Sequence, residues 1–434
     1  MIVALAWLLG GAILVLEMAR GGAFRERRGD GGLALTLYLL VSLAIGVGFA
    51  LVLAGRQASL VGIQAQTLED VIGIADRVAG LLAMYYGFIV FVLVAGGVAL
   101  WLGVQRQPRQ TAHPWGVIVL IVLVVLVGAT VVRTNLRPIQ ADVVYKQADP
   151  YDREAQWPVA IEYYKHALAL APREDFYYLY LGRAYLEYAT SLEDPAVRDT
   201  VLRETEQVLL EAREINPLNT DHSANLARMY QSWAGFASDT ETRQALLQRS
   251  SDNYATATSL SPHHAILWNE WAVLQYYGLG DTTAFEQTIQ HSLELDPDFD
   301  ETWMVQGDMH MVQNEPEEAI ADLARALGLN PQARPQGGRP VWHWTIYYNA
   351  LAWYPYGYSL AIANRYEEAT IAFLKALELE PNALYAWDCH RVLAIAYQNM
   401  GQIGDALFHA QAALDLAPED QRPAMQELVA QLSG

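Results

Sequence analysis

Four long apolar stretches with almost no charge occupy the first third of the 434-residue chain. They run from Ile2 to Ala19, from Leu33 to Ala54, from Ala79 to Gly103 and from Trp115 to Val132. An α-helix needs about 20 apolar residues to cross a bilayer core, where each backbone N–H and C=O must find its partner inside the helix. The pattern therefore predicts four transmembrane helices.

After Val132 the pattern changes to amphipathic segments that end in proline. "AIEYYKHALALAP", from Ala160 to Pro172, is followed later by "SLELDP", "ALGLNP", "ALELEP" and "ALDLAP". Proline stops a helix because it lacks the backbone N–H and clashes with the preceding turn. Two of the proline spacings are 34 and 35 residues, which is typical of tetratricopeptide repeats (TPRs), units of two antiparallel helices. The prolines are Pro172, Pro217, Pro262, Pro297, Pro331, Pro381 and Pro418.

A shared register inside these segments supports the repeat. Positions counted back by the same steps from Pro331 and from Pro381 hold the same residue types, and an earlier segment carries a similar set. The small residues are expected where the two helices of a pair approach most closely, with aromatic residues filling the space beside that contact. These repeat-core residues are Tyr178, Gly182, Tyr185, Trp303, Gly307, Ala319, Trp353, Gly357 and Ala369.

The sequence thus predicts an all-α fold, with a four-helix transmembrane region followed by a TPR α-solenoid. Stacked helix pairs bury a continuous core and form a curved inner surface for binding. The expected parts are a membrane domain at 1–135, a junction with an incomplete first repeat helix at 136–155, a solenoid of about seven repeats at 156–418 and a capping helix at 419–434.

Two local features depart from the simple pattern. The longer proline spacings predict insertions at Ser191–Asp199, near Ser238–Thr242 and at Gln332–Val341, the last of them a loop. Between the second and third spans, the apolar face of Leu68, Val71, Ile72, Ala75 and Ala79 predicts a helix lying on the outer membrane surface.

Charge predicts the orientation in the membrane. Arg25, Arg27 and Arg28 follow the first span, and Arg106 and Arg109 follow the third, so these short loops are expected in the cytoplasm and the repeats outside. The first span lacks a basic start, which favours a chain that is the tail of a longer membrane protein. Residues 1–141 carry a net charge of +4 and the rest −24, which argues against a nucleic-acid partner.

The densest aromatic stretch is a candidate binding surface. Trp342, His343, Trp344, Tyr347 and Tyr348 precede the repeat register and have no assigned partner. Flat aromatic faces with a polar edge suit a peptide or a sugar ring. The alternative is an extra helical turn packed against the solenoid.

No set of residues predicts catalysis, a cofactor or a metal. "DPDFDE", Asp296 to Glu301, lacks the glycine and the bidentate glutamate of a calcium loop, and His263 and His264 have no third ligand for zinc. The single cysteine, Cys389, lies on a face expected to be buried. The abundant acidic residues are expected mostly on solvated helix faces.

The junction "RTNLRPIQADVVYKQA", Arg133 to Ala148, and the repeat after it resemble bacterial membrane proteins of the O-antigen ligase or polymerase-like family. The resemblance implies the transfer of lipid-linked glycan chains on the outer face of the cytoplasmic membrane. It carries over no catalytic residue, because the longest outer loop, Arg56–Val78, has no histidine. The chain is then the C-terminal portion of such a protein, or a degenerate relative.

The function expected from these patterns is a multi-pass, membrane-anchored TPR scaffold in cell-envelope assembly, on the extracytoplasmic side of the bacterial cytoplasmic membrane. Its expected partners are the lipid bilayer and a protein in the groove, with a glycan or lipid-linked glycan as the other candidate. The alternative is part of a glycan transferase whose catalytic portion is absent from this chain. No transferase activity is expected of the chain alone.

Overall fold

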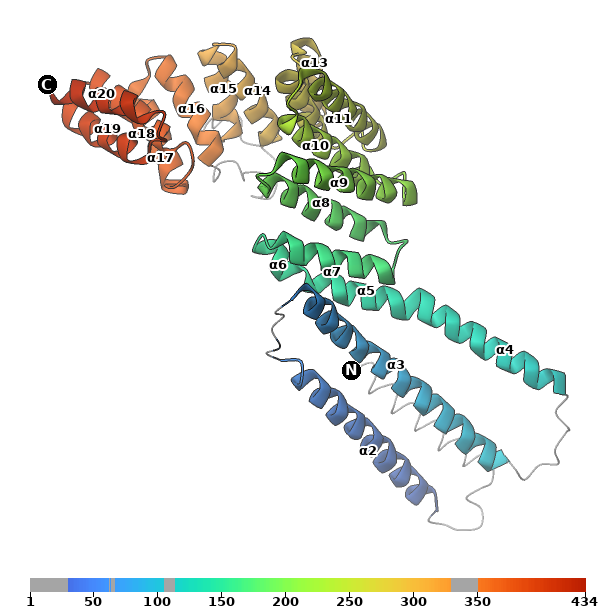
Figure 1. Cartoon of the computed structure of the whole chain (residues 1–434). Coiled ribbons are helices and arrows are strands. Elements are labelled where there is room, and N and C mark those ends of the chain that lie inside the picture. The colour runs from blue at the N-terminus through green and yellow to red at the C-terminus, as the bar shows by residue number, and fades with distance from the viewer. Residues whose placement is uncertain (1–29, 62, 64–66, 105–113, 329–349) are drawn as a thin grey trace. The chain divides into compact units, whose positions relative to one another are not determined.

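The computed structural model describes residues 30–61, 63, 67–104, 114–328 and 350–434, and every regular element in these ranges is helical (Figure 1). The chain divides into two compact units, the first ending at Ile215 and the second running from Asn216 to Gly434. This boundary falls inside the predicted solenoid. Within the first unit, the apolar helix α3 (Leu68–Val104) packs against the junction helix α5 (Arg137–Gln147) and against α7 (Trp157–Leu170).

Three apolar helices of the first unit coincide with the second, third and fourth predicted spans. They are α2 (Asp30–Ala58), α3 and α4 (Pro114–Val131), and each contains a stretch long and apolar enough to cross a membrane. The first predicted span, Ile2–Ala19, lies outside the described residues. α4 passes through a π-helical turn (Val132–Leu136) directly into α5.

The segment expected as a separate helix on the membrane surface is instead the beginning of α3. Val71, Ala75 and Ala79 are buried, and the Gln140 side chain of α5 donates a hydrogen bond of 3.4 Å to the Ala79 carbonyl. His166 Nε2 of α7 lies 2.7 Å from a carboxylate oxygen of Asp76. Val71, Ala75 and Ala79 of the predicted apolar face are therefore covered by protein, because α5 and α7 pack against this part of α3.

Helix pairs dominate the described residues after α5. There, α6 (Asp149–Arg153) and α7 are followed by six pairs whose helices pack against each other, and then by α20 (Arg422–Ser433) against the last pair. The pairs are α8–α9 (Asp175–Ser191, Pro195–Ile215), α10–α11 (Thr220–Phe236, Thr240–Leu260), α12–α13 (Ala265–Val273, Thr282–Leu295), α14–α15 (Asp300–Val312, Pro316–Ala326), α16–α17 (Ala350–Ile362, Tyr366–Leu379) and α18–α19 (Ala386–Asn399, Ile403–Leu416).

The prolines end helices as the sequence predicts. In the described part of the chain, α7, α9, α11, α13, α17 and α19 each stop two residues before their proline, while Pro331 lies outside it. The first two insertions mostly lengthen helices. α9 and α11 both have 21 residues, whereas α13, α17 and α19 have 14. The third, Gln332–Val341, lies outside the described residues.

Glycines of the repeat register mark the closest approach inside three pairs. A Cβ on Gly182 would lie 2.5 Å from a methyl carbon of Leu209, and one on Gly307 would lie 2.6 Å from Cγ of Leu323. A Cβ on Gly357 would lie 3.1 Å from the ring of Phe373. Small residues therefore stand at these positions because the partner helix supplies a large side chain.

We expect Gly307→Ala to lower the free energy of unfolding by about 1–3 kcal/mol, because the new methyl group must displace Leu323. Gly404→Ala is the matched control, since nothing lies within 4 Å of its added Cβ. That control should be neutral or stabilising, because alanine restricts the unfolded chain more than glycine does. Urea unfolding of both variants measures the difference, and equal effects would contradict this packing.

Trp353 and Tyr185 of the register are buried, whereas the aromatic residues at the start of three first helices also bind the turn before them. Trp303 is only half-buried, and its indole N–H donates a hydrogen bond of 2.9 Å to the Pro297 carbonyl. Trp268 does the same to Pro262 at 2.9 Å, and Tyr178 donates to Pro172 at 3.3 Å. Each of these three aromatic side chains thus satisfies the carbonyl of the proline six residues earlier and fixes the turn between repeats.

Candidate protein-binding groove

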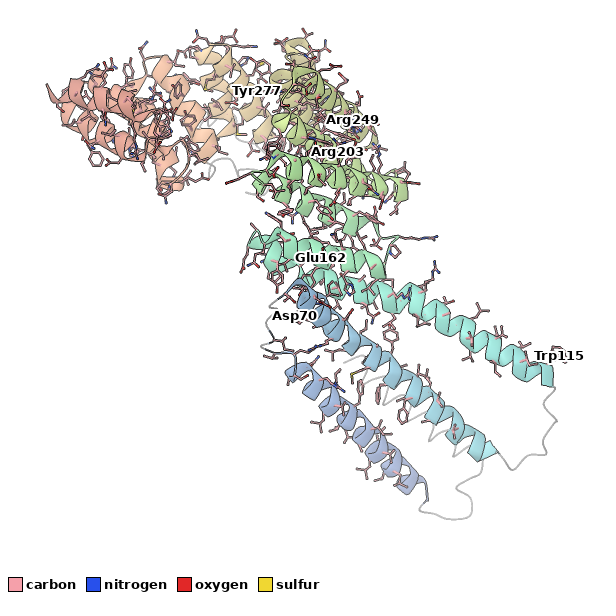
Figure 2. All side chains as sticks on the ribbon, viewed as in Figure 1. Asp70, Trp115, Glu162, Arg203, Arg249 and Tyr277 are labelled. Atoms are coloured by element: carbon pink, nitrogen blue, oxygen red, sulfur yellow. The ribbon has the colours of Figure 1, made fainter. Side chains whose placement is uncertain are left out.

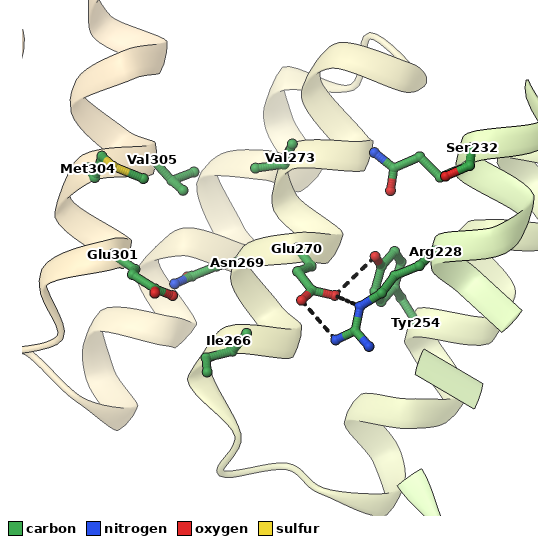
Figure 3. A pocket seen from close by; sticks show the side chains of 11 residues that line it. Arg228, Ser232, Tyr254, Ile266, Asn269, Glu270, Val273, Glu301, Met304 and Val305 are labelled. Carbon is green, nitrogen blue, oxygen red and sulfur yellow. Dashed lines mark hydrogen bonds and ion pairs between the residues drawn. The ribbon is translucent and has the colours of Figure 1, made fainter. Parts of the chain in front are cut away.

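The first helices of four successive pairs line a groove in the second unit. Its first lobe has a volume of about 480 Å³ and lies between α10, α12 and α14, and its second lobe has about 350 Å³ and continues to α16. The lobes adjoin, because Val273, Met304 and Val305 line both of them. Figure 3 shows the first lobe from close by.

Helical periodicity places the groove residues. On α14, Glu301, Met304, Asp308 and Met311 follow each other at intervals of three, four and three residues, so they form one stripe along the helix. All four line the groove. A neighbouring face of the same helix carries Gly307, which contacts α15. One amphipathic helix therefore serves the core and the groove with different faces.

An ion pair closes one end of the first lobe. The Arg228 guanidinium of α10 binds the Glu270 carboxylate of α12 through two contacts, at 2.8 and 2.9 Å. The hydroxyl of Tyr254 donates to the same carboxylate at 3.1 Å, and the three side chains point toward one another in Figure 3. Burial, and then the charge of Glu270, raise the pKa of Tyr254. This network keeps Tyr254 protonated and holds α10 and α12 together.

The second lobe is richer in tyrosine. The Tyr277 hydroxyl donates to the Asp308 carboxylate at 3.2 Å, and Tyr277 stands in a π-helical turn (Leu274–Gly278), a distortion often found at functional sites. Beyond it, the Tyr354 hydroxyl donates to Asp388 at 2.6 Å, and Arg391 donates to the same carboxylate at 2.6 Å. Tyr277 and Tyr354 of this lobe are therefore each held by a carboxylate, of which only Asp308 lines the groove itself.

Two carboxylates of the groove are held in partly dehydrated surroundings. Burial raises the pKa of Glu301, and the negative charge of Glu270 raises it further. Burial also raises the pKa of Asp308, although the hydrogen bond from Tyr277 opposes this shift. A positive charge on a bound ligand would stabilise the ionised form of both carboxylates.

The sequence did not single out these groove residues. It proposed Trp342, His343, Trp344, Tyr347 and Tyr348, which all lie outside the described residues. The register contained a usable signal, however, because Glu301 and Asp308 precede and follow Gly307 by six and one residues. Residues at those offsets from the helix-contact glycine face away from the second helix of the pair.

Within the described ranges, no group of three or more His, Cys, Asp or Glu side chains is arranged to hold a metal ion. Cys389 is fully buried, as the sequence predicted, and burial raises the pKa of its thiol to about 12. The thiol is therefore protonated at neutral pH, and its side chain packs in the core between α16, α17 and α18.

Comparison with known proteins bears on one repeat directly. A family model for the tetratricopeptide repeat matches residues 350–383, which comprise α16, α17 and the turn after them. This segment is a tetratricopeptide repeat. The other TPR-like pairs repeat its layout of first helix, short turn, second helix and closing proline, so the described helix pairs form a TPR-like solenoid. No curated protein matches the chain in sequence.

Solved TPR structures share part of this arrangement. A thermophilic TPR protein from Thermus thermophilus is 17% identical, with a TM-score of 0.37, and the match covers 49% of this chain and 98% of that one. YrrB, described as a TPR protein with an unusual peptide-binding site, is 17% identical at a TM-score of 0.36, with coverages of 51% and 98%. A TPR protein from Parabacteroides merdae is 12% identical at a TM-score of 0.41, with coverages of 68% and 99%.

Proposed function

We propose that this protein is a membrane-anchored TPR scaffold that holds a segment of a partner protein in the groove between α10 and α16, outside the cytoplasmic membrane. The observation that carries the scaffold role is the two-lobed groove itself. It has apolar walls and a few inward polar groups, which is the usual composition of a recognition site. We infer that the recruited partner works in cell-envelope assembly.

Exposed apolar surface supports the anchor. Leu51 of α2, Leu93 of α3 and Val125 of α4 are 69%, 69% and 65% exposed, and many neighbours on these helices are similarly exposed. Figure 2 draws the side chains of these helices, with Trp115 of α4 labelled. Soluble proteins rarely expose continuous apolar patches of this kind. Lipid is the natural cover for three such helices, because each is long enough to cross a bilayer.

A photo-reactive residue placed in the groove tests the scaffold role. Met304 lines both lobes, whereas Phe408 is 68% exposed on the second helix α19. In intact cells, we expect the probe at Met304 to cross-link a specific second protein, and the probe at Phe408 not to capture that protein. Equal capture by the two probes, or none by either, would count against a protein partner in this groove.

We expect the solenoid to lie on the extracytoplasmic side of the cytoplasmic membrane. A cysteine introduced at Leu384 tests this orientation. Leu384 is 97% exposed, so a thiol there reacts wherever the reagent can reach. A membrane-impermeant maleimide should label Leu384→Cys in cells with a permeabilised outer layer but an intact cytoplasmic membrane. The unaltered chain is the control, because its buried Cys389 should stay unlabelled. Labelling that occurs only after lysis would mean that the solenoid lies on the cytoplasmic side, which contradicts the proposed orientation.

A further inference from the structure

The charges that line the groove do not balance. Arg228 and Glu270 neutralise each other, which leaves Glu301 in the first lobe and Asp308 in the second. Among the side chains that the structure describes, no lysine, arginine or histidine forms an ion pair with either of these carboxylates. Among the side chains described, each lobe therefore keeps one negative charge without a cationic partner.

Both remaining charges are costly to the free protein. Glu301 and Asp308 are half-buried, and burial weakens the hydration of a carboxylate. Glu270 lies close enough to raise the pKa of Glu301 by repulsion, and its own charge is already engaged by Arg228. A cation from a ligand would offset this cost, whereas an acidic ligand would increase it.

An apolar saddle separates the two charges. Val273, Met304 and Val305 belong to both lobes, with Ile266 at one side and Met311 and Leu351 at the other. Methionine side chains adapt to differently shaped apolar partners. The saddle can therefore cover an apolar side chain of a bound segment without fixing its identity.

The spacing of the two charges sets the spacing in the ligand. Glu301 and Asp308 are seven residues apart on one α-helix, so their backbones are separated by about 10 Å. A helical ligand lying along α14 presents side chains at the same separation when they are seven residues apart.

We propose that the groove recognises a helical protein segment that carries two basic side chains about two turns apart, with apolar side chains between them. Glu301 receives one cation, Asp308 receives the other, and the saddle receives the apolar side chains. This inference rests on the proposed scaffold function and specifies the chemistry of its partner. Basic amphipathic helices thus form the partner class, and acidic segments are excluded by repulsion.

Synthetic peptides test the charge rule with the purified full chain in detergent. The probe is an amphipathic helical peptide with two lysines seven residues apart on its apolar face. Two companion peptides replace both lysines by norleucine or by glutamate. We expect the lysine peptide to bind about tenfold more tightly than the norleucine peptide, and its binding should weaken as the salt concentration rises. The glutamate peptide should not bind.

Variants then assign the two contacts. Glu301→Gln and Asp308→Asn should each weaken binding of the lysine peptide about fivefold, because each removes one partly buried ion pair. Glu318→Gln, an exposed position on the second helix α15, is the matched control and should leave binding unchanged. Equal affinity for the lysine and norleucine peptides, or variants that bind the lysine peptide normally, would overturn the proposal.

A neutral variant could lose binding because the groove has lost stability. A charge-reversed variant separates that effect from the loss of a specific charge contact. Glu301→Lys combined with Asp308→Lys should bind the glutamate peptide and reject the lysine peptide, which a merely damaged groove cannot do. Failure of this swap would also overturn the charge rule. If the cross-link at Met304 persists while the peptides show no charge preference, the scaffold function stands and only the partner chemistry is wrong.

Discussion

Replacing Phe373 by alanine should lower the free energy of unfolding of the second unit by about 3–5 kcal/mol. Phe373 of α17 is fully buried, and its ring lies against Gly357, Tyr354 and Tyr358 of α16. The substitution leaves a cavity at the closest contact of the pair, and the glycine opposite has no side chain with which to fill it.

Phe408→Ala is the matched control for this prediction. It removes the same side chain from α19 in the same unit, but Phe408 is 68% exposed, so the expected change is within about 0.5 kcal/mol. Hydrogen exchange of α16 and α17 during urea unfolding measures both variants. Comparable losses at the two positions would mean that the pair is not held together by this ring.

Acidification should destabilise the last helix pair through His409. This side chain is 7% exposed between α18 and α19, its Nδ1 lies 2.9 Å from Nδ1 of His390, and its ring stacks on Tyr397. Burial, and then His390, lower the pKa of His409 to about 4, while Asp405 acts in the opposite direction. Burial lowers the pKa of His390 as well.

The direction of the effect follows from proton binding. Between pH 6.5 and about 4 the unfolded chain protonates at His409 while the folded chain does not, so stability falls as the pH falls through this window. The shift corresponds to about 3 kcal/mol, fully lost only below pH 4. Unfolding of the C-terminal helices at pH 7.5, 6, 5 and 4 measures the loss.

His409→Gln should remove most of this pH dependence and can keep a hydrogen bond to His390. His263→Gln, at an exposed position in the turn between α11 and α12, should retain it. If the His409 variant loses stability with acid as steeply as the unaltered chain, the carboxylates elsewhere in the unit control the response.

The sequence determined the repeat because repeat geometry is local. A closing proline and a glycine ten residues later, as in Pro297 and Gly307, fix where a helix ends and where the next one packs. Long uncharged stretches likewise determined three apolar helices, since length and composition suffice for that prediction. Neither inference needs knowledge of a distant residue.

Tertiary structure decided what covers each exposed face. Val71 and Ala75 form an apolar stripe that suits lipid or protein equally well in sequence, and only the fold brings α5 and α7 onto it. The sequence also could not separate solvated acidic residues from those of the groove. Glu270 meets its counter-charge in Arg228, which lies 42 residues away, whereas Glu301 and Asp308 meet none among the described side chains. A carboxylate's partner and hydration depend on neighbours brought together by folding, so its role is decided by the tertiary structure.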